Sequence, residues 1–197
     1  AQLPPDMLDV VVTKQNYFRY HATLQIIPPD GAYIINEDYV INDLDGNNNG
    51  VLDYGETVGL TLTLKNVGSE DATNVSATLT TSDEYITIQN DMAEFGTIPS
   101  NTTLTVENGF TFTAAGDIPN GHVVEFEIIS SDNDSSWTSS AFVPAHAPIL
   151  AFVSYVVDDA AGNNNGRIDP GETVNLQVTM NNSGSSDAFD VMGLLTS

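Results

Sequence analysis

Apolar and polar residues alternate over much of the chain, most clearly in residues 57–64. There the apolar positions are Val58, Leu60, Leu62 and Leu64. A period of two is typical of a β-strand that buries one face. Similar runs predict strands at 7–14, 21–27, 33–41, 73–81, 85–89, 102–106, 110–113, 123–129, 137–143, 149–157 and 173–180. No window has helical periodicity, so the sequence predicts an all-β protein.

Turn-forming residues separate these runs. The predicted turns fall at 66–69, 108–109, 120–121 and 132–134. Between residues 32 and 147 they divide the chain into about seven or eight strands, a number and spacing that indicate an immunoglobulin-like β-sandwich. Residues 1–31 hold two further strand-like runs, which we interpret as the C-terminal hairpin of a preceding immunoglobulin-like domain.

The chain contains an internal duplication with an offset of 116 residues. Residues 43–81 align without a gap to residues 159–197, with 21 identities in 39 pairs. Such self-similarity marks tandem copies of one module. Residues 32–147 are therefore predicted to form a complete β-sandwich, and residues 148–197 the first half of a second repeat.

The duplicated stretch begins with a loop whose side-chain oxygens are regularly spaced. Counted from Asp45, positions 1, 3, 5, 9 and 12 are Asp45, Asn47, Asn49, Asp53 and Glu56. Position 6 is a glycine, and the carbonyl of Val51 stands at position 7. This is the oxygen pattern of an EF-hand calcium loop, because a short loop can surround a hard cation only if alternate side chains point inward. The sequence predicts that these residues bind Ca²⁺.

The second loop repeats this pattern with one change. Its predicted ligands are Asn163, Asn165, the carbonyl of Arg167, Asp169 and Glu172, but position 1 is Ala161, which has no side-chain oxygen. An aspartate two residues further upstream, Asp43 in the first loop and Asp159 in the second, occurs in both copies. We therefore expect Asp43 and Asp159 to be ligands too, or the second site to be weaker. The competing interpretation is that both loops are ordinary Asn/Gly/Asp turns.

The charge of the chain limits its partners. There are 27 Asp and Glu against 4 Lys and Arg, a net charge of −23. This charge excludes nucleic acid as a partner and disfavours an anionic membrane surface. No apolar run is long enough to insert in a membrane. The absence of Cys rules out disulfides and thiol chemistry, which leaves bound calcium as the expected staple of a secreted β protein.

No set of residues indicates catalysis. The three histidines, His21, His122 and His146, are far apart in the sequence, and alternation places Glu125 and Glu127 on the solvent face of a strand. Trp137 is better explained by core packing than by a sugar-binding platform. The chain is therefore predicted not to be an enzyme.

The two loops, each followed by an alternating strand and Asn-x-Gly, resemble repeats of large secreted Bacteroidetes-type proteins. Residues 11–17, continuing to Pro28-Pro29-Asp30-Gly31, resemble the segment that follows the catalytic domain in gingipain-type cysteine peptidases. The resemblance implies a secreted or cell-surface multidomain protein, exported by the type IX route, in which these domains are non-catalytic stalk or adhesion modules. The family's catalytic Cys and His have no counterpart in this chain.

Two further functions remain open at the sequence level. A half sandwich would leave an apolar face and open strand edges. The chain is either a piece of a longer multidomain protein or the subunit of an extracellular filament that assembles head-to-tail by strand complementation between copies. A module that binds a carbohydrate, or a host or matrix protein or glycan, is the other alternative.

Overall fold

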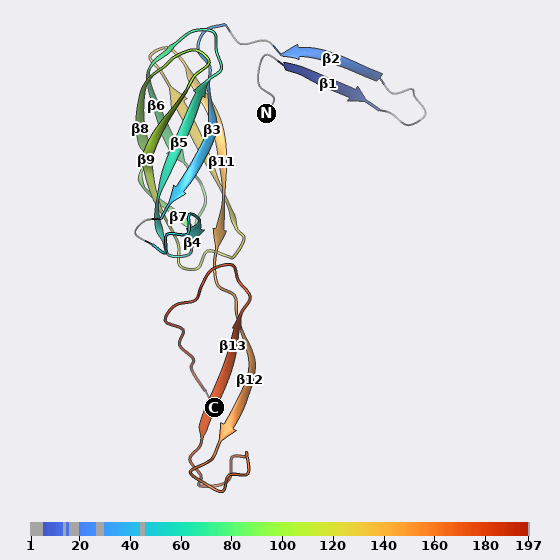
Figure 1. Ribbon diagram of the computed structural model, residues 1–197, viewed down its shortest axis with the longest axis vertical. Coiled ribbons are helices and arrows are strands. Elements are labelled where there is room, and N and C mark those ends of the chain that lie inside the picture. Colours follow the sequence, from blue (N-terminus) through green and yellow to red (C-terminus); the bar gives the residue numbers. More distant parts are fainter. Residues whose placement is uncertain (1–5, 14, 16–19, 27–29, 44–45, 197) are drawn as a thin grey trace.

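The computed structural model describes residues 6–13, 15, 20–26, 30–43 and 46–196 of the chain (Figure 1). All elements in this part of the chain are β-strands. Its central region is a sandwich of two sheets, and separate two-stranded hairpins lie beyond it on either side. The strands are β1 (Asp6–Val12), β2 (Tyr20–Ile26), β3 (Ile34–Asn42), β4 (Leu52–Asp53), β5 (Thr57–Asn66), β6 (Ala72–Thr80), β7 (Ile86–Asn90), β8 (Met92–Ile98), β9 (Thr103–Ala114), β10 (Val123–Ser131), β11 (Ser136–His146), β12 (Leu150–Asp158) and β13 (Asn175–Asn182).

The sandwich consists of a four-stranded and a five-stranded sheet. The first has the order β3-β5-β9-β7 and the second the order β4-β11-β10-β6-β8. The strand pairs are antiparallel except for β4 and β11, which run parallel over two residues. Each sheet turns one row of alternate apolar residues inward, among them Leu60 and Leu62 of β5 and Phe126 and Ile128 of β10, which are fully buried and fill the space between the sheets. Phe112 of β9 and Phe126 of β10 meet across this core with ring centroids 4.7 Å apart.

The predicted alternation of β5 is confirmed, because Val58, Leu60, Leu62 and Leu64 are all buried. The same holds for β10, whose Glu125 and Glu127 lie on the exposed face. Trp137 packs against the core cluster, as expected.

The predicted turn at Asn108-Gly109 is wrong. Both residues lie inside β9, which joins the predicted strands 102–106 and 110–113 into one. Asn108 adopts a left-handed φ of 50°, and its N–H donates to Thr61 Oγ1 across the sheet. The register of β5 and β9 shifts at this point, which is the signature of a β-bulge. Asn and Gly favour such left-handed positions in bulges as well as in turns.

Strand β8 was missed by the alternation pattern. Its buried residues are Ala93, Phe95 and Ile98, so the interval changes from two to three within the strand. Gly96 has a φ of 74° at this point, and the register of β6 and β8 shifts beside it. A second bulge therefore disguises the period of two.

The two hairpins are built by antiparallel pairs. In β1–β2, Leu8 lies opposite Leu24 and Val10 opposite Ala22. The hairpin β12–β13 corresponds to β3 and β5 at the offset of 116, and even the register shift at Asn36/Asp38 recurs at Phe152/Ser154. The described part of the chain contains no helix of the length and hydropathy needed to span a bilayer.

Candidate metal centre

The first loop, defined as residues 43–56, connects β3 to β5 at one end of the sandwich. Short strand β4 within it pairs with the end of β11, so that Leu52 lies opposite Ala145 and Asp53 opposite His146. Leu52 is completely buried in the core. The loop therefore leaves the four-stranded sheet, touches the five-stranded sheet through β4 and returns, which links both sheets at this end.

Asp43 fixes the fold of the loop from its first residue. Its carboxylate accepts the backbone N–H of Asn49 at 2.8 Å and that of Gly50 at 3.0 Å. Its backbone carbonyl also accepts the N–H of Gly46 at 2.7 Å. Asp43 is only 2% exposed, so these donors replace water around a buried carboxylate. In this structure Asp43 holds the loop backbone, a role that the spacing alone had not indicated.

Two asparagines converge on Asp53. The side-chain amides of Asn47 and Asn49 donate to Asp53 Oδ2 at 2.6 Å and 2.8 Å. Their oxygens accept the N–H groups two residues ahead, those of Asn49 and Val51. Two alternate positions of the loop, Asn47 and Asn49, are therefore tied to the same carboxylate through their NH2 groups.

The other oxygen of Asp53 has no partner. Asp53 is 4% exposed, and Oδ1 is buried without a hydrogen bond. A buried carboxylate oxygen without a donor is costly, because the group has lost its water and gained nothing in return. This oxygen is therefore available to a cation.

Glu56 closes the loop. Its two oxygens accept the backbone N–H groups of Asn47 at 3.3 Å and Asp53 at 3.2 Å. The pKa of Glu56 is raised, chiefly because the carboxyl is partly buried. The two backbone hydrogen bonds offset part of this rise, and the charges of Asp43 and Asp53 add to it. A Cβ at Gly46 would collide with Glu56 Oε1, which explains why glycine stands there.

The second loop, residues 159–172, reproduces these contacts. Asp169 Oδ2 accepts the amides of Asn163 at 2.6 Å and Asn165 at 2.8 Å. Asp159 is 3% exposed, and its Oδ2 accepts the backbone N–H groups of Asn165 and Gly166.

The remaining contacts of the second loop also match the first. Glu172 accepts the N–H groups of Asn163 and Asp169, and the N–H of Arg167 donates to Asn165 Oδ1. The two amide hydrogen bonds lower the pKa of Asp169. The duplication therefore extends from sequence to individual hydrogen bonds.

The structure brings most of the predicted ligands together. Asn47, Asn49, Asp53 and Glu56 meet in the first loop, and their counterparts meet in the second, whereas Asp45 lies outside the described residues. Within the described residues, no three His, Cys, Asp or Glu side chains form a group that could hold a metal ion. The groups that converge are the carboxylate of Asp53 and the NH2 groups of Asn47 and Asn49, whose amide oxygens accept backbone N–H groups instead. Carboxylate oxygens, and amide oxygens once the amides turn, are the ligands that suit a hard cation such as Ca²⁺.

A junction beside the first loop was not predicted. Ser186 and Phe189 of the second repeat line a cavity together with Asn47, Asp53 and Glu56. The N–H of Phe189 approaches the hydroxyl of Tyr54 at 3.5 Å, and Asn120 accepts hydrogen bonds from Ala147 and Ser185. These contacts join residues 27, 65 and 135 positions apart, so no local pattern could reveal them.

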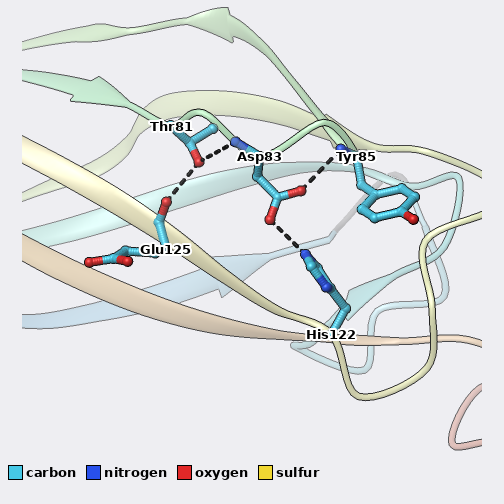
Figure 2. Close-up of polar contacts among 5 residues, drawn as sticks. All are labelled: Thr81, Asp83, Tyr85, His122 and Glu125. Carbon is cyan, nitrogen blue, oxygen red and sulfur yellow. Dashed lines mark hydrogen bonds and ion pairs between the residues drawn. The ribbon is translucent and has the colours of Figure 1, made fainter.

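A second polar cluster involves His122 and Asp83 (Figure 2). His122 Nε2 lies 2.6 Å from Asp83 Oδ2, and the rings of Tyr85 and His122 make a T-shaped contact with centroids 5.2 Å apart. Thr81 Oγ1 donates to the carbonyl of Glu125 and accepts the N–H of Asp83. The cluster fastens residues 81–85 to the start of β10. His146 contacts Ser185 Oγ at 2.8 Å.

Comparisons with known proteins add little. No protein-family model matches the chain, and a search of curated proteins finds no match. The chain is similar to the crystal structure of the CsuC-CsuE chaperone-tip adhesion subunit pre-assembly complex from archaic chaperone-usher Csu pili of Acinetobacter baumannii, at 10% identity and a TM-score of 0.23, covering 66% of this chain and 84% of that chain. A TM-score this low does not establish a common fold, so the fold rests on the strand pairing described above.

Proposed function

We propose that this chain is a non-catalytic region of tandem immunoglobulin-like repeats, stapled by Ca²⁺, that acts as a spacer or adhesion segment of a secreted or cell-surface protein. The strand order supports the immunoglobulin-like assignment. Leaving aside the short edge strand β4 and taking β3, β5, β6, β7, β9, β10 and β11 in chain order as strands A to G, the first sheet reads A-B-E-D and the second G-F-C, with the extra strand β8 at the edge beside C. The first order is that of the immunoglobulin fold, and the second adds an edge strand to its other sheet.

The observation that carries the calcium proposal is the unpartnered oxygen of Asp53. Asp53, Asp43 and Glu56 bring three carboxylates into one loop, and the charges of the two aspartates raise the pKa of Glu56. Like charges held together in a partly buried site destabilise a fold unless a cation compensates for them. Repetition of the same network in the second loop argues against an accidental turn.

In this proposal the ion would be held by Asn47, Asn49, Asp53, Glu56 and the carbonyl of Val51, with Asp45 assigned from the sequence. A bound Ca²⁺ supplies positive charge that bridges oxygen ligands. The chain's own residues do the rest: Asp43 holds the loop backbone, and Leu52 anchors it in the core. Because β4 joins the loop to β11, tightening the loop would brace both sheets and the adjoining junction.

The acidic composition and the resemblance to secreted Bacteroidetes-type repeats support an extracellular setting, where free calcium is abundant enough to fill such sites. The absence of Cys fits a role for calcium as the alternative staple. The gingipain-type peptidase remains a proposal for the parent protein only.

Thermal unfolding with calcium and with a chelator tests the proposal. At a calcium concentration one hundred times Kd, binding to the folded state stabilises by about 2.7 kcal/mol. That stabilisation corresponds to a rise in Tm of roughly 5–15 °C for a domain of this size. Glu56→Gln, which preserves shape but removes a charge, should abolish most of this difference.

The matched control is Glu125→Gln, because Glu125 lies on an exposed strand face away from the loop. It should retain the full calcium effect. Identical melting curves of the unmodified protein in calcium and in chelator would refute the stabilising role, as would equal effects of Glu56→Gln and Glu125→Gln.

A further inference from the structure

The motif Asn-x-Gly-Ser follows the alternating strand in both repeats and folds back on the segment that enters each of them. In the first repeat, Asn66 Oδ1 accepts the N–H groups of Tyr33 and Gly68, and the N–H of Ser69 donates to the carbonyl of Gly31. A Cβ at Gly68 would lie 2.3 Å from the same carbonyl oxygen, so only glycine permits this approach. We define the entry clasp of the first repeat as residues 31–33 and 66–69.

The second repeat forms the same clasp. Asn182 Oδ1 accepts the N–H groups of Ile149 and Gly184, and the N–H of Ser185 donates to the carbonyl of Ala147. Each of these bonds has its equivalent in the first repeat at the offset of 116 residues. The shape of the clasp is therefore set by its own residues. The entry clasp of the second repeat consists of residues 147–149 and 182–185.

Asn120 of the first repeat contacts this second clasp. Its side-chain oxygen accepts the N–H of Ala147 at 3.0 Å, the N–H of Ser185 at 3.3 Å and the hydroxyl of Ser185. Because the proton of that hydroxyl points to Asn120, the donor in the contact between His146 and Ser185 Oγ is Nδ1 of the imidazole. One amide oxygen therefore binds three donors of the clasp.

The turn that carries Asn120 is held in place by the first repeat. The N–H of His122 closes the turn on the carbonyl three residues earlier at 3.1 Å, and Gly121 has a φ of 78°, as in a type II turn. The N–H of Gly121 donates to the carbonyl of Ala145 at 2.9 Å, and the side chain of His122 lies 2.6 Å from that of Asp83 (Figure 2). The first repeat therefore presents Asn120 to the clasp from a fixed position.

The first clasp shows a different partner for the equivalent N–H group. There the N–H of Gly31, which corresponds to that of Ala147, donates to Ser69 Oγ at 3.2 Å. In the second clasp the N–H of Ala147 donates to Asn120, and the hydroxyl of Ser185 turns to the same asparagine. The clasp thus has two arrangements, one closed on its own serine and one docked on an asparagine. Both give the N–H group an acceptor, so docking leaves no polar group unpaired.

Contacts from the rest of a complete sandwich fall on other atoms of the clasp. In the first repeat, the hydroxyl of Ser100 donates to the carbonyl of Gly68 at 2.7 Å, and its N–H donates to Asp71 Oδ1 at 2.9 Å. The atoms that correspond to those bound by the asparagine are the N–H of Gly31 and the N–H and Oγ of Ser69. Docking of an asparagine is therefore compatible with a completed second sandwich.

We propose that the turn at residues 119–122 is a docking site for the entry clasp of the following repeat, that Asn120 recognises this clasp, and that the contact holds tandem repeats at one angle. The partner that fits presents a backbone N–H before its first strand and, directly after the glycine of its motif, a residue with a hydroxyl group. None of the side chains in this contact is a proposed calcium ligand. The proposal therefore goes beyond the calcium proposal and does not depend on it.

Distances between two spin labels report the angle between the repeats, because the chain has no native Cys and labels attach only at introduced ones. Thr138→Cys on β11 and Thr179→Cys on β13 provide exposed positions in the full chain. This labelled chain should give one narrow distribution of distances. Asn120→Ala should broaden the distribution about twofold or more, because two N–H groups and a hydroxyl lose their acceptor. Asn120→Asp, which keeps an oxygen acceptor at the same place, should preserve the narrow distribution.

The duplication supplies a matched control. Ser185→Ala removes the hydroxyl that donates to Asn120 and should broaden the distribution, whereas Ser69→Ala, at the equivalent position of the first repeat, should leave it unchanged. A broad distribution in the labelled chain without further substitution would overturn the proposal. An unchanged width in Asn120→Ala, or equal effects of the two serine substitutions, would overturn it as well.

The same measurements in calcium and in chelator separate this contact from the ion. The contrast between Asn120→Ala and Asn120→Asp should appear in both conditions. A contrast that appears only with calcium would mean that the ion, rather than Asn120, sets the angle between the repeats, and would overturn the proposal.

Discussion

The two repeats have nearly the same loop but very different strands beside it. In both, an aspartate holds the loop backbone, two asparagines meet a second aspartate and a glutamate closes the ring. Yet β5 is buried within a two-sheet core, whereas among the described residues β13 pairs only with β12. The loop geometry is therefore set by contacts within about fourteen residues and does not require a completed sandwich. Burial of the strands depends on distant partners.

Removal of a core side chain should show the largest difference between the repeats. Leu62→Ala deletes a fully buried side chain from β5 and should cost about 2–5 kcal/mol of unfolding free energy. Val178→Ala, at the equivalent position of β13, should cost less than about 0.5 kcal/mol in the monomer, since that side chain is half exposed. Urea unfolding at low protein concentration measures both. Equal costs would mean that the face of β13 is covered even in a monomer.

The duplicated asparagine gives the next largest contrast. Asn66→Ala leaves the N–H groups of Tyr33 and Gly68 and the carbonyl of Ile98 without their partner in the interior, which should cost about 2–4 kcal/mol. Asn182→Ala should cost about 1 kcal/mol, because its surroundings are open to water. The comparison fails if the second substitution is as damaging as the first.

The second loop has Ala161 where the first loop has the aspartate of position 1, and a substitution can supply this carboxylate. Ala161→Asp supplies the position-1 carboxylate that Asp45 provides in the first loop and should tighten calcium binding there about tenfold, because affinity rises with ligand charge. Isothermal titration in a Glu56→Gln background isolates the second loop. Ala160→Asp, one position away, adds the same charge as a control. If both substitutions tighten binding equally, general electrostatics rather than ligation is responsible.

The smallest effect concerns pH. Because the folded pKa of Glu56 is raised, the folded state binds this proton more tightly than the unfolded state, and stability without calcium is gained as pH falls through that pKa. The pKa of Asp169 is lowered, so its contribution is present above the unfolded pKa and is lost as pH falls through the folded value.

The proposed calcium would have to displace the proton of Glu56, so the proposed calcium-induced rise in Tm should disappear as pH falls through the raised pKa. Melting curves from roughly pH 7 to pH 4 with and without calcium test this, since carboxylates titrate in that range. In Glu56→Gln the stability gained at low pH without calcium should be lost. A calcium effect independent of pH would contradict the assignment of Glu56.

The sequence alone determined the elements whose cause is local. Alternation located most strands, because neighbouring residues of a strand face opposite sides, and the spacing of oxygens located both loops, because each asparagine bonds to a residue two positions ahead. Bulges at Asn108 and Gly96 hid the true extent of β9 and the existence of β8, since each breaks the period of two.

Only the tertiary structure decided what the local patterns face. Leu62 and Val178 stand in the same pattern, and their burial differs because strands far away in the sequence cover only one of them. The clamp of Asp43 on the loop backbone, the unpartnered oxygen of Asp53 and the contact of Tyr54 with Phe189 likewise depend on the position of groups in space. Local hydrogen bonds and side-chain alternation depend on residues close in the sequence, whereas the burial of a side chain depends on which distant strands pack against it.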